Sequence, residues 1–326
     1  MNRRGAVLAL AALGAVPLSS LAQQARKIWR VGLLSPGFSL SNLDPRNLFQ
    51  QRMHELGYVE GKNLVMERRF ADNKLERLPG LAIELVRLKV DVIVAAAIAA
   101  TSAARKATST IPIVMLHAGD PIGAGLVASL ARPGGNVTGT TSMIPELGAK
   151  QVQLIRELVP RIAKLGVLVN PTNAGTAQWL ANVTDAARSF NIRLVTAKVT
   201  RAEDFQQAHT MLRDARSDGL LVLGDPLIFG NRARIMEFAA SARLPASYDL
   251  GQIVRDGGLL SYGTVFAEHY AMGADYVDKI LRGAKPVDLP VEQPRKFEMV
   301  INLKTAKALG ITIPQSLLVR ADEVIQ

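Results

Sequence analysis

Two aspartates follow apolar stretches of this sequence, each within a Gly-Asp-Pro tripeptide. Asp120 comes shortly after the apolar stretch 113–116, and Asp225 comes shortly after 220–223. An ionised carboxylate in such a place can hold a cationic group of a ligand through charge-assisted hydrogen bonds. Aspartate before proline is also ordinary helix-capping and turn chemistry, which is the competing interpretation of each residue taken alone. We expect the two aspartates to occupy equivalent places in two halves of the chain, and at least one of them to face a ligand.

Small and polar residues near the same places would complete a binding site. Ser35, Thr101 and Asn170 can donate or accept neutral hydrogen bonds. The small side chains of 96–100 would let backbone N–H groups approach a carboxylate closely. Tyr248 and Tyr262 offer aromatic faces, unless they only pack at the join between two lobes. A zwitterion would satisfy all of these groups, and the predicted ligand-binding residues are Ser35, Ala97, Ala99, Thr101, Asp120, Asn170, Asp225, Tyr248 and Tyr262.

The sequence motifs of catalysis and of cofactor binding are missing. There is no G-x-x-x-x-G-K, no G-x-G-x-x-G after the first predicted strand and no H-E-x-x-H. In Gly258–Gly263 the serine comes one residue too late for a G-x-S-x-G nucleophile elbow. The chain has no cysteine, its 4 histidines are isolated in sequence, and only His117 is expected at a strand end. We therefore predict no catalytic residue, no metal site and no cofactor.

Short β-branched segments alternate with amphipathic ones from Trp29 onward. Apolar runs such as Val92–Val94 lack the alternation of a half-exposed strand, which favours parallel strands covered on both faces. Strands that alternate with helices in this way indicate a doubly wound α/β layer. The first half of the pattern predicts strands at 29–34, 63–68, 90–95 and 113–116, and helices at 47–56, 75–88 and 99–108.

The same order then restarts. It predicts strands at 165–169, 193–197, 220–223 and 245–248, and helices at 176–190, 204–215 and 232–242. The second and third strands are separated by the same interval in both halves, which predicts two similar Rossmann-like lobes. Trp179 falls inside a predicted helix, and we expect it in the core rather than at a ligand.

Further elements follow the second half of the pattern. They are a strand near 259–261, a helix at 266–281, a strand at 297–302 and a helix at 303–309. We expect the tail to return to the first lobe and cross back, so that three segments form a hinge, the first near 140–144. This predicts an N-terminal lobe of residues 28–142 plus about 264–292, and a C-terminal lobe of residues 143–263 plus about 293–326.

The N-terminus has the parts of an export signal. Arg3 and Arg4 precede an apolar run over 5–18, and small residues lead up to Ala22. We expect a signal peptide over 1–22, cleaved near Ala22, a periplasmic location, and no lipid anchor because no cysteine is available. The net charge of +11 is spread along the chain, which favours a solvated basic surface. Export also argues against nucleic acid as a partner.

Several longer segments point to one family. They are Leu56–Asn63, Gly119–Val127, Leu130–Gly139, Gly258–Gly263 and Phe297–Leu309. These resemble the ABC transporter substrate-binding family that includes tryptophan- and tyrosine-binding members. The resemblance implies a type I periplasmic-binding-protein fold, in which two lobes close over a small solute, and delivery of the solute to an ABC permease in the inner membrane. The implied solute is an amino acid, aromatic or not, or a related carboxylate.

These observations favour a periplasmic solute-binding protein that works as a monomer. A periplasmic sensor subunit, which presents its closed lobes to a membrane receptor, would need the same cleft, so the sequence does not separate the two. A secreted α/β enzyme is disfavoured by the missing motifs.

Overall fold

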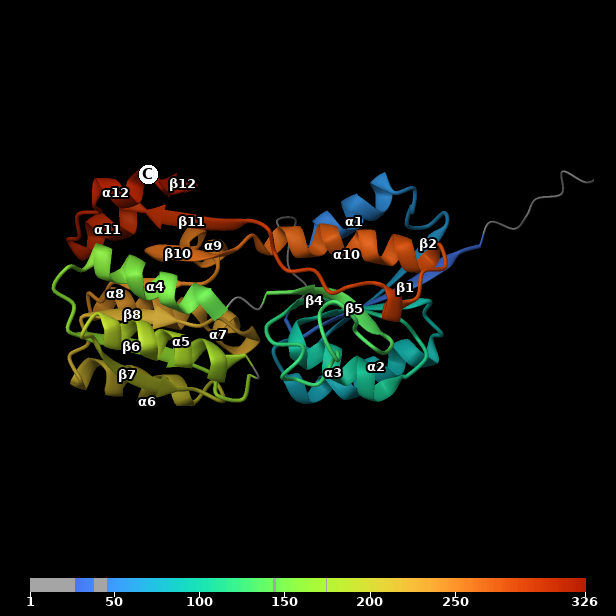
Figure 1. Ribbon diagram of the computed structural model, residues 1–326, viewed down its shortest axis with the longest axis horizontal. Coiled ribbons are helices and arrows are strands. Elements are labelled where there is room, and N and C mark those ends of the chain that lie inside the picture. Colours follow the sequence, from blue (N-terminus) through green and yellow to red (C-terminus); the bar gives the residue numbers. More distant parts are fainter. Residues whose placement is uncertain (1–26, 38–45, 143–144, 174) are drawn as a thin grey trace, which may run out of the picture.

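The computed structural model describes residues 27–37, 46–142, 145–173 and 175–326. The predicted signal peptide over 1–22 and part of the first predicted crossing lie outside these ranges. Two α/β domains, each built on its own sheet, lie next to each other along the long axis of the molecule (Figure 1). We call these two lobes the first and the second domain. Within the described ranges, no helix is both long and apolar enough to cross a membrane.

The first domain is built on a five-stranded parallel sheet. Its elements are β1 (Trp29–Ser35), α1 (Arg46–Glu55), β2 (Leu64–Phe70), the 3-10 helix η1 (Leu75–Arg77), α2 (Leu78–Arg87), β3 (Val92–Ala96), α3 (Ala97–Ala107), β4 (Ile113–Ala118) and β5 (Val137–Thr141). The strand order is β2-β1-β3-β4-β5, and all neighbouring strands are parallel.

The second domain repeats this order and then extends it. Its elements are α4 (Pro145–Leu158), β6 (Lys164–Val169), α5 (Thr176–Ser189), β7 (Arg193–Lys198), α6 (Asp204–Asp214), β8 (Gly219–Val222), α7 (Pro226–Gly230), α8 (Arg232–Ser241), β9 (Ala246–Tyr248), α9 (Gly251–Arg255), β10 (Leu260–Thr264), β11 (Phe297–Asn302), α11 (Leu303–Leu309), α12 (Gln315–Leu318) and β12 (Glu323–Ile325). The order β7-β6-β8-β9-β10 matches that of the first sheet, and β11 adds to it antiparallel to β10. The predicted pair of Rossmann-like lobes is confirmed.

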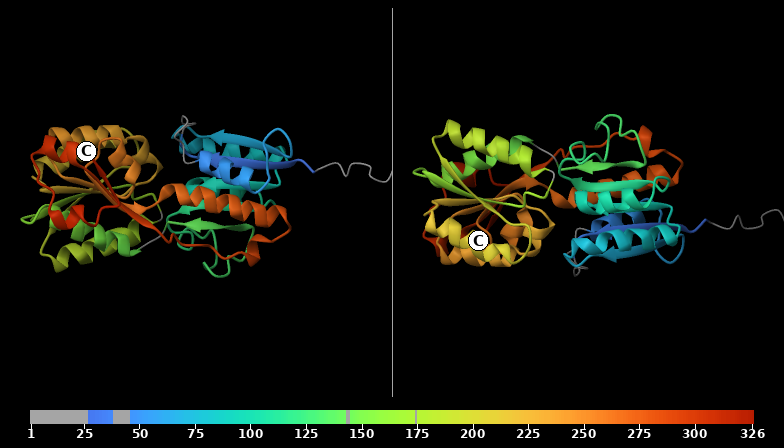
Figure 2. Two further views of the ribbon diagram at one scale, coloured as in Figure 1. Left: turned by 90° about the horizontal axis from the view of Figure 1, so that it is seen from above. Right: turned by 90° about the horizontal axis from the view of Figure 1, so that it is seen from below.

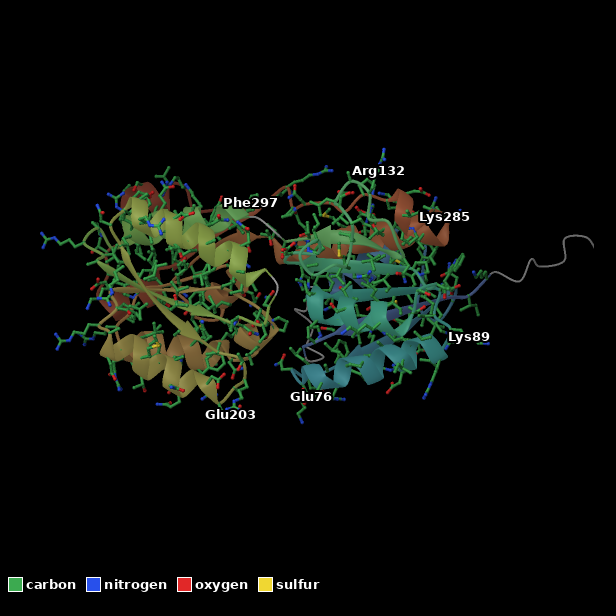
Figure 3. All side chains as sticks on the ribbon, turned by 60° about the horizontal axis from the view of Figure 1, so that its bottom comes forward. Glu76, Lys89, Arg132, Glu203, Lys285 and Phe297 are labelled. Carbon is green, nitrogen blue, oxygen red and sulfur yellow. The ribbon has the colours of Figure 1, made fainter. Side chains whose placement is uncertain are left out.

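Three segments of the chain cross between the domains. The chain leaves the first domain after β5 and enters α4, which packs on α5 of the second domain. It returns after β10 into α10 (Phe266–Leu281), which packs on α1 and β4, as Figure 2 shows, and continues through η2 (Pro286–Asp288). Glu292 then pairs with Thr140, and the chain re-enters the second domain at Phe297 (Figure 3). The predicted three-segment hinge is confirmed, while the residue boundaries predicted for the lobes stay a prediction.

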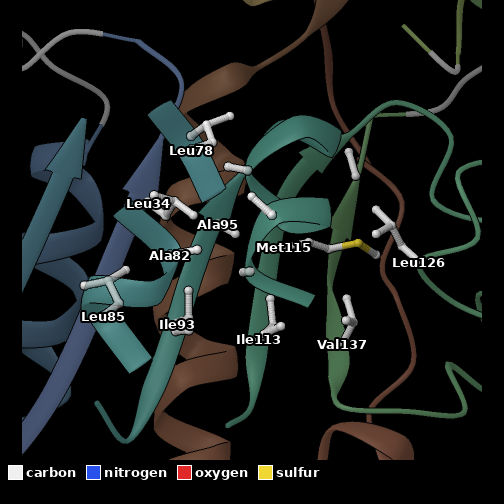
Figure 4. Close-up of a cluster of buried hydrophobic side chains, with 14 of the residues drawn as sticks. Leu34, Leu78, Ala82, Leu85, Ile93, Ala95, Ile113, Met115, Leu126 and Val137 are labelled. Atoms are coloured by element: carbon white, nitrogen blue, oxygen red, sulfur yellow. The ribbon is translucent and has the colours of Figure 1, made fainter. Parts of the chain in front are cut away.

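Both faces of the first sheet are covered by helices. On one face, side chains of α2 and α3 pack against the strands, with Leu85, Ile93 and Met115 fully buried (Figure 4). On the other face, α1 and α10 contribute Phe49 and Val277, also fully buried. Burial on two faces explains why these strands lack the alternation of a half-exposed strand. It also fixes the strand ends, from which the loops of the candidate site extend.

The second sheet is covered in the same way, by α6, α7, α8 and α9 on one face and by α4 and α5 on the other. A buried hydrogen-bonded chain ties these layers together. The Trp179 indole N–H donates to Gln151 over 3.0 Å, and the Gln151 amide donates to the backbone carbonyl of Tyr262, also over 3.0 Å. Trp179 is 6% exposed, so its predicted place in the core is confirmed.

We expect Gly263→Ala to destabilise the second domain. A methyl group at Gly263 on β10 would collide with the backbone carbonyl of Asp249, which the neighbouring strand holds in place. Overpacking of this kind costs about 1–3 kcal/mol, and more where backbone must move. Urea unfolding followed by circular dichroism measures this loss. In the control, Gly80→Ala, the exposed helical glycine has no atom near its added methyl group, and a gain of about 0.5–1 kcal/mol is expected. Equal urea midpoints for Gly263→Ala and the wild type would contradict the prediction.

Candidate ligand-binding site

The carboxyl ends of the strands in the two domains meet at the domain interface. A methyl group on Gly175, just before α5, would lie 3.6 Å from the carbonyl carbon of Gly119, just after β4. A second contact joins the Asn73 side chain, after β2, to Gly230 at the end of α7. In open α/β sheets, ligands bind beyond the carboxyl ends of the strands. The candidate site is therefore the region between these facing strand ends.

On the first domain, the site is bordered by an uncapped helix. Helix α3 begins at Ala97, directly after β3, and its N-cap residue Ala96 provides no side-chain hydrogen bond. Ala97 has a φ of +62°, in the left-handed region that costs a residue other than glycine about 1 kcal/mol or more. The Ile98 side chain approaches Gly119 at the end of the next strand. On the second domain, α5 begins at Thr176, and its N-cap residue Gly175 provides no side-chain hydrogen bond, although the Thr176 N–H donates to the Asn173 carbonyl over 3.0 Å. Free N–H groups at such helix ends favour an anion.

On the second domain, Asn170 and Asp225 form a polar pair. The Asn170 amide donates to Asp225 Oδ2 over 2.5 Å, and its own oxygen accepts from the N–H and hydroxyl of Thr172. Asp225 Oδ1 accepts from the Ile228 N–H over 2.8 Å and so caps α7. Burial raises the pKa of Asp225, and these two hydrogen bonds oppose that rise. Asp225 therefore has a capping role and also lies at the strand ends.

Asp249 joins this pair, and the sequence reasoning did not place it among the site residues. It follows β9, and its carboxyl group lies against Gly224, the neighbour of Asp225. Its Oδ1 is closed to solvent and accepts no hydrogen bond from any residue in the described ranges. The pKa of Asp249 is raised to about 7, mainly by burial; hydrogen bonds from the backbone N–H groups of Asp249 and Gly224 oppose the rise, and the charge of Asp225 adds to it. Counting strands would have found it, since Asp249 follows the fourth strand of the second half.

The expectation that Asp120 and Asp225 occupy equivalent places is wrong. Asp225 follows β8, which corresponds to β3 in the first domain, whereas Asp120 follows β4, which corresponds to β9. The counterpart of Asp120 is therefore Asp249. The Gly-Asp-Pro tripeptide recurs because each aspartate serves a turn: Asp120 Oδ1 accepts from the Gly123 N–H over 2.8 Å, as Asp225 does from Ile228.

Three other residues predicted to bind the ligand, Ser35, Thr101 and Ala99, make their contacts within the first domain. The Ser35 hydroxyl accepts from the Gly37 N–H over 3.3 Å, and Ser35 is 7% exposed. The fully buried Thr101 donates to the Ala97 carbonyl over 2.8 Å, within its own helix. Ala99 packs against the hydrophobic core. We therefore leave Thr101 out of the candidate site, because its hydroxyl is enclosed by the fold.

Neither predicted tyrosine presents a free aromatic face. Tyr248 is 1% exposed and packs in the core of the second domain, where Gly258 lies against its ring, so we also leave it out of the site. Tyr262 stacks on Phe297 with ring centroids 6.0 Å apart. Phe297 starts β11 where the chain crosses between the domains, so Tyr262 packs at the hinge, the alternative expected for it.

Two partly exposed aromatic residues that the sequence reasoning missed flank the Asn73–Gly230 contact. Phe70 ends β2, three residues before Asn73, and Phe229 immediately precedes Gly230. Their positions at a strand end and in the helix after β8 could have been noticed, but neither lies in a motif.

Two histidines meet beneath the hinge. His117, near the end of β4 as predicted, has its ring 6.1 Å from that of His269 on α10. His269 also bonds to Thr140 and Thr264, which lie on two of the crossing segments. Burial lowers the pKa of His117 to about 3 and that of His269 to about 4, so both are neutral at neutral pH. The pair thus links the hinge segments through uncharged hydrogen bonds.

A surface cavity of about 480 Å³ lies elsewhere, between α5 and β7 at the edge of the second sheet. It is lined by side chains such as Thr184, Arg188 and Leu194, and by none of the residues at the facing strand ends. We place the candidate site at the strand ends rather than in this cavity, because the helix N-termini without side-chain caps and the buried carboxyl groups of Asp225 and Asp249 lie there.

Comparisons with known proteins agree with this geometry. The sequence pattern of the ABC transporter substrate binding protein family matches residues 41–325. A tyrosine-binding protein of Clostridioides difficile (strain R20291) is 29% identical over 263 residues, which are 81% of this chain and 75% of that protein.

Solved structures show the same fold. A conserved domain protein from Vibrio cholerae has a TM-score of 0.86 at 30% identity, covering 91% of this chain and 100% of that one. An ABC domain from Streptococcus pneumoniae in complex with L-Trp has a TM-score of 0.84 at 28% identity, covering 91% and 99%. The chain belongs to the ABC transporter substrate-binding protein family and has the type I periplasmic-binding-protein fold.

We expect Asp249→Asn to stabilise the protein without ligand more at pH 8 than at pH 5. The folded state raises the pKa of Asp249 to about 7, whereas an unfolded aspartate titrates at about 4. The stability associated with the protonated Asp249 is therefore fully present below about pH 4 and is lost as the pH rises to 7. The neutral amide removes this loss. Calorimetric melting of the wild type and of Asp249→Asn at each pH measures the difference in their stability. The buried histidines change stability with pH in the opposite sense, but they do so equally in both proteins and therefore cancel in this difference. Asp185→Asn, on the exposed face of α5, should show no such pH dependence. A smaller gain at pH 8 than at pH 5 would contradict the assignment.

Proposed function

We propose that this protein is the periplasmic solute-binding subunit of an ABC importer, and that it binds an aromatic amino acid without altering it chemically. One observation carries the proposal: uncapped helix N-termini and buried carboxyl groups lie together at the facing strand ends. A zwitterion carries the two complementary charges, because its carboxylate suits the helix ends and its ammonium group suits the carboxyl groups.

The carboxylate of the solute would bind at the start of α3. Apart from Ile98, the residues around Ala97 have small side chains, so backbone N–H groups are accessible, and the helix dipole adds to their attraction. Helix α5 approaches the same place from the second domain through Gly175. A ligand held by both domains favours the closed arrangement, because it binds that arrangement more tightly than the open one.

The ammonium group would bind on the second domain, beside Asp225. Asn170 donates to this carboxyl group and so positions it. Among the described residues, Asp225 has no ion-pair partner. Ser35 and Asp120 remain candidates for neutral or charged contacts from the first domain.

The aromatic part of the proposal rests on the relatives and on two side chains. The C. difficile relative is a tyrosine-binding protein, and the S. pneumoniae structure holds L-Trp. Phe70 and Phe229 are partly exposed and pack against the cores of their own domains, and Arg232 lies over the Phe229 ring. We propose that their remaining exposed surface contacts a flat side chain of the ligand. Delivery to a membrane permease follows from membership in the family, and the periplasmic location follows from the predicted export signal.

Asp225→Ala should weaken the binding of L-tyrosine or L-tryptophan by about 1–3 kcal/mol, the scale of a lost charge-assisted hydrogen bond. Asp120→Ala should weaken it less, because that carboxylate serves its own turn. Isothermal titration calorimetry measures both, with the exposed Asp185→Ala as the matched control. Unchanged affinity in both site variants would remove these residues from the binding site.

Deletion of the gene should abolish uptake of the radiolabelled solute. Normal uptake, with loss of a ligand-induced response, would instead favour the sensor subunit, because a sensor binds the same solute without supplying a permease.

A further inference from the structure

The carboxyl groups of Asp225 and Asp249 lie at the ends of adjacent strands without a cation to balance them. Asp249 rests on Gly224, and Asp225 is the next residue along the chain. Neither forms an ion pair with any lysine, arginine or histidine in the ranges that the structure describes. Asp225 at least accepts from Asn170 and Ile228, whereas Oδ1 of Asp249 accepts from no described donor. Buried polar atoms are nearly always partnered, so this oxygen points to a missing donor.

The charged groups around Asp249 do not provide that donor. Arg255 on α9 and Glu298 on β11 lie near Gly251, two residues further along the chain. Arg255 donates to Glu298 over 2.8 Å and to Glu323 over 2.7 Å, so its guanidinium is committed to those carboxylates. Arg232, at the start of α8, is paired with Asp256. The charged group next to Asp249 is therefore Asp225, which has the same sign.

The two equivalent aspartates of the domains differ in one respect. Asp120 and Asp249 both follow the fourth strand of their sheet, but Asp120 accepts a backbone hydrogen bond from Gly123. Asp249 keeps part of its surface exposed, and its backbone is held by the close packing of Gly263. Asp249 thus lies at the facing strand ends with one carboxyl oxygen, Oδ1, that accepts no hydrogen bond from a described residue.

We infer that Asp249 is the main partner of the ligand's ammonium group, and that binding releases a proton from the Asp225–Asp249 pair. This inference rests on the proposed function and deepens it. In the free protein near neutral pH, the pair keeps a proton because burial disfavours the charged form of Asp249, and the charge of Asp225 adds to this effect. When R–NH₃⁺ enters, the Asp249 carboxyl group gives its proton to solvent, and the carboxylate that remains accepts from the ammonium group.

The pKa of Asp249, about 7 without ligand, fits this step. Below pH 7 the ligand must displace a bound proton, so its dissociation constant should rise about tenfold per pH unit as the pH falls from 7 to 5. Above pH 7 the affinity should level off. A ligand without an ammonium group gains nothing from the deprotonated pair.

The test is isothermal titration calorimetry of the full-length mature protein at pH 5, 6, 7 and 8. The probes are L-tyrosine and L-tryptophan, together with 3-(4-hydroxyphenyl)propionate and indole-3-propionate, which lack only the ammonium group. Repeating the titration at pH 6 in phosphate and in a second buffer of high ionisation enthalpy counts the protons released. We expect close to one proton, the stated pH dependence, and at least about a 100-fold loss of affinity for the deaminated acids. Asp249→Asn should lower affinity for the amino acids and flatten the pH profile, while Asp185→Asn should match the wild type.

The outcomes separate the two proposals. If an amino acid binds with constant affinity from pH 5 to 8, releases no proton and binds Asp249→Asn equally well, the inference is overturned and the proposed function stands. If neither amino acid binds at any pH, the proposed function fails, and the inference fails with it. Should Asp249→Asn not fold, which circular dichroism would show, the proton count and the pH profile of the wild type still decide.

Discussion

Unbalanced negative charge at the ends of β8 and β9 is the constraint on which the candidate site depends. Asp225 and Asp249 bring two carboxyl groups together where burial weakens solvation, and burial raises the pKa of both. The fold offsets this cost elsewhere, in strands that are covered on both faces by helices. The close packing of Gly263 on the Asp249 backbone carbonyl fixes the backbone from which that carboxyl group extends. A site that costs stability in the free protein and recovers it through a cationic ligand is common where binding is selected over stability.

The hinge determines how such a site can be used. Helices α4 and α10 each follow the last of the five equivalent strands of one sheet, and each packs on the other domain. Together with the segment that enters β11, they leave three connections between two otherwise separate cores. The partly exposed His117 and the buried His269 join these segments without charge near neutral pH. We propose that domain closure draws on contacts at the strand ends, where a ligand that touches both domains would shift it by its greater affinity for the closed form.

Much of this architecture is readable from the sequence, because continuous apolar strands alternate with amphipathic helices. Strand β5 was not predicted, because its buried residues Thr138, Thr140 and Thr141 are polar and form no apolar run. Their hydroxyl groups are hydrogen-bonded to residues distant in sequence, such as the carbonyl groups of Leu289 and Ala118. The repeated Gly-Asp-Pro tripeptide led to the wrong pairing of Asp120 with Asp225, because the same turn chemistry can follow strands that are not equivalent in the two domains. Tyr248 and Thr101 show the other limit: a residue near a strand end can point into the core, which only packing decides. Asp249 lies in no motif, so only its place after the fourth strand of the second half marks it in the sequence, and its unpartnered Oδ1 is seen only in the structure.

We propose that the two domains close over a small zwitterion held at their facing strand ends. The chain has no cysteine, so spin labels can be attached to two introduced ones, at the exposed Glu76 of the first domain and the exposed Glu203 of the second (Figure 3). Pulsed electron–electron double resonance then measures the distance between the labels with and without L-tyrosine or L-tryptophan. We predict a distribution that narrows and moves to the shorter distance of the closed form when the amino acid is added. A distribution that stays the same at saturating ligand would contradict the account.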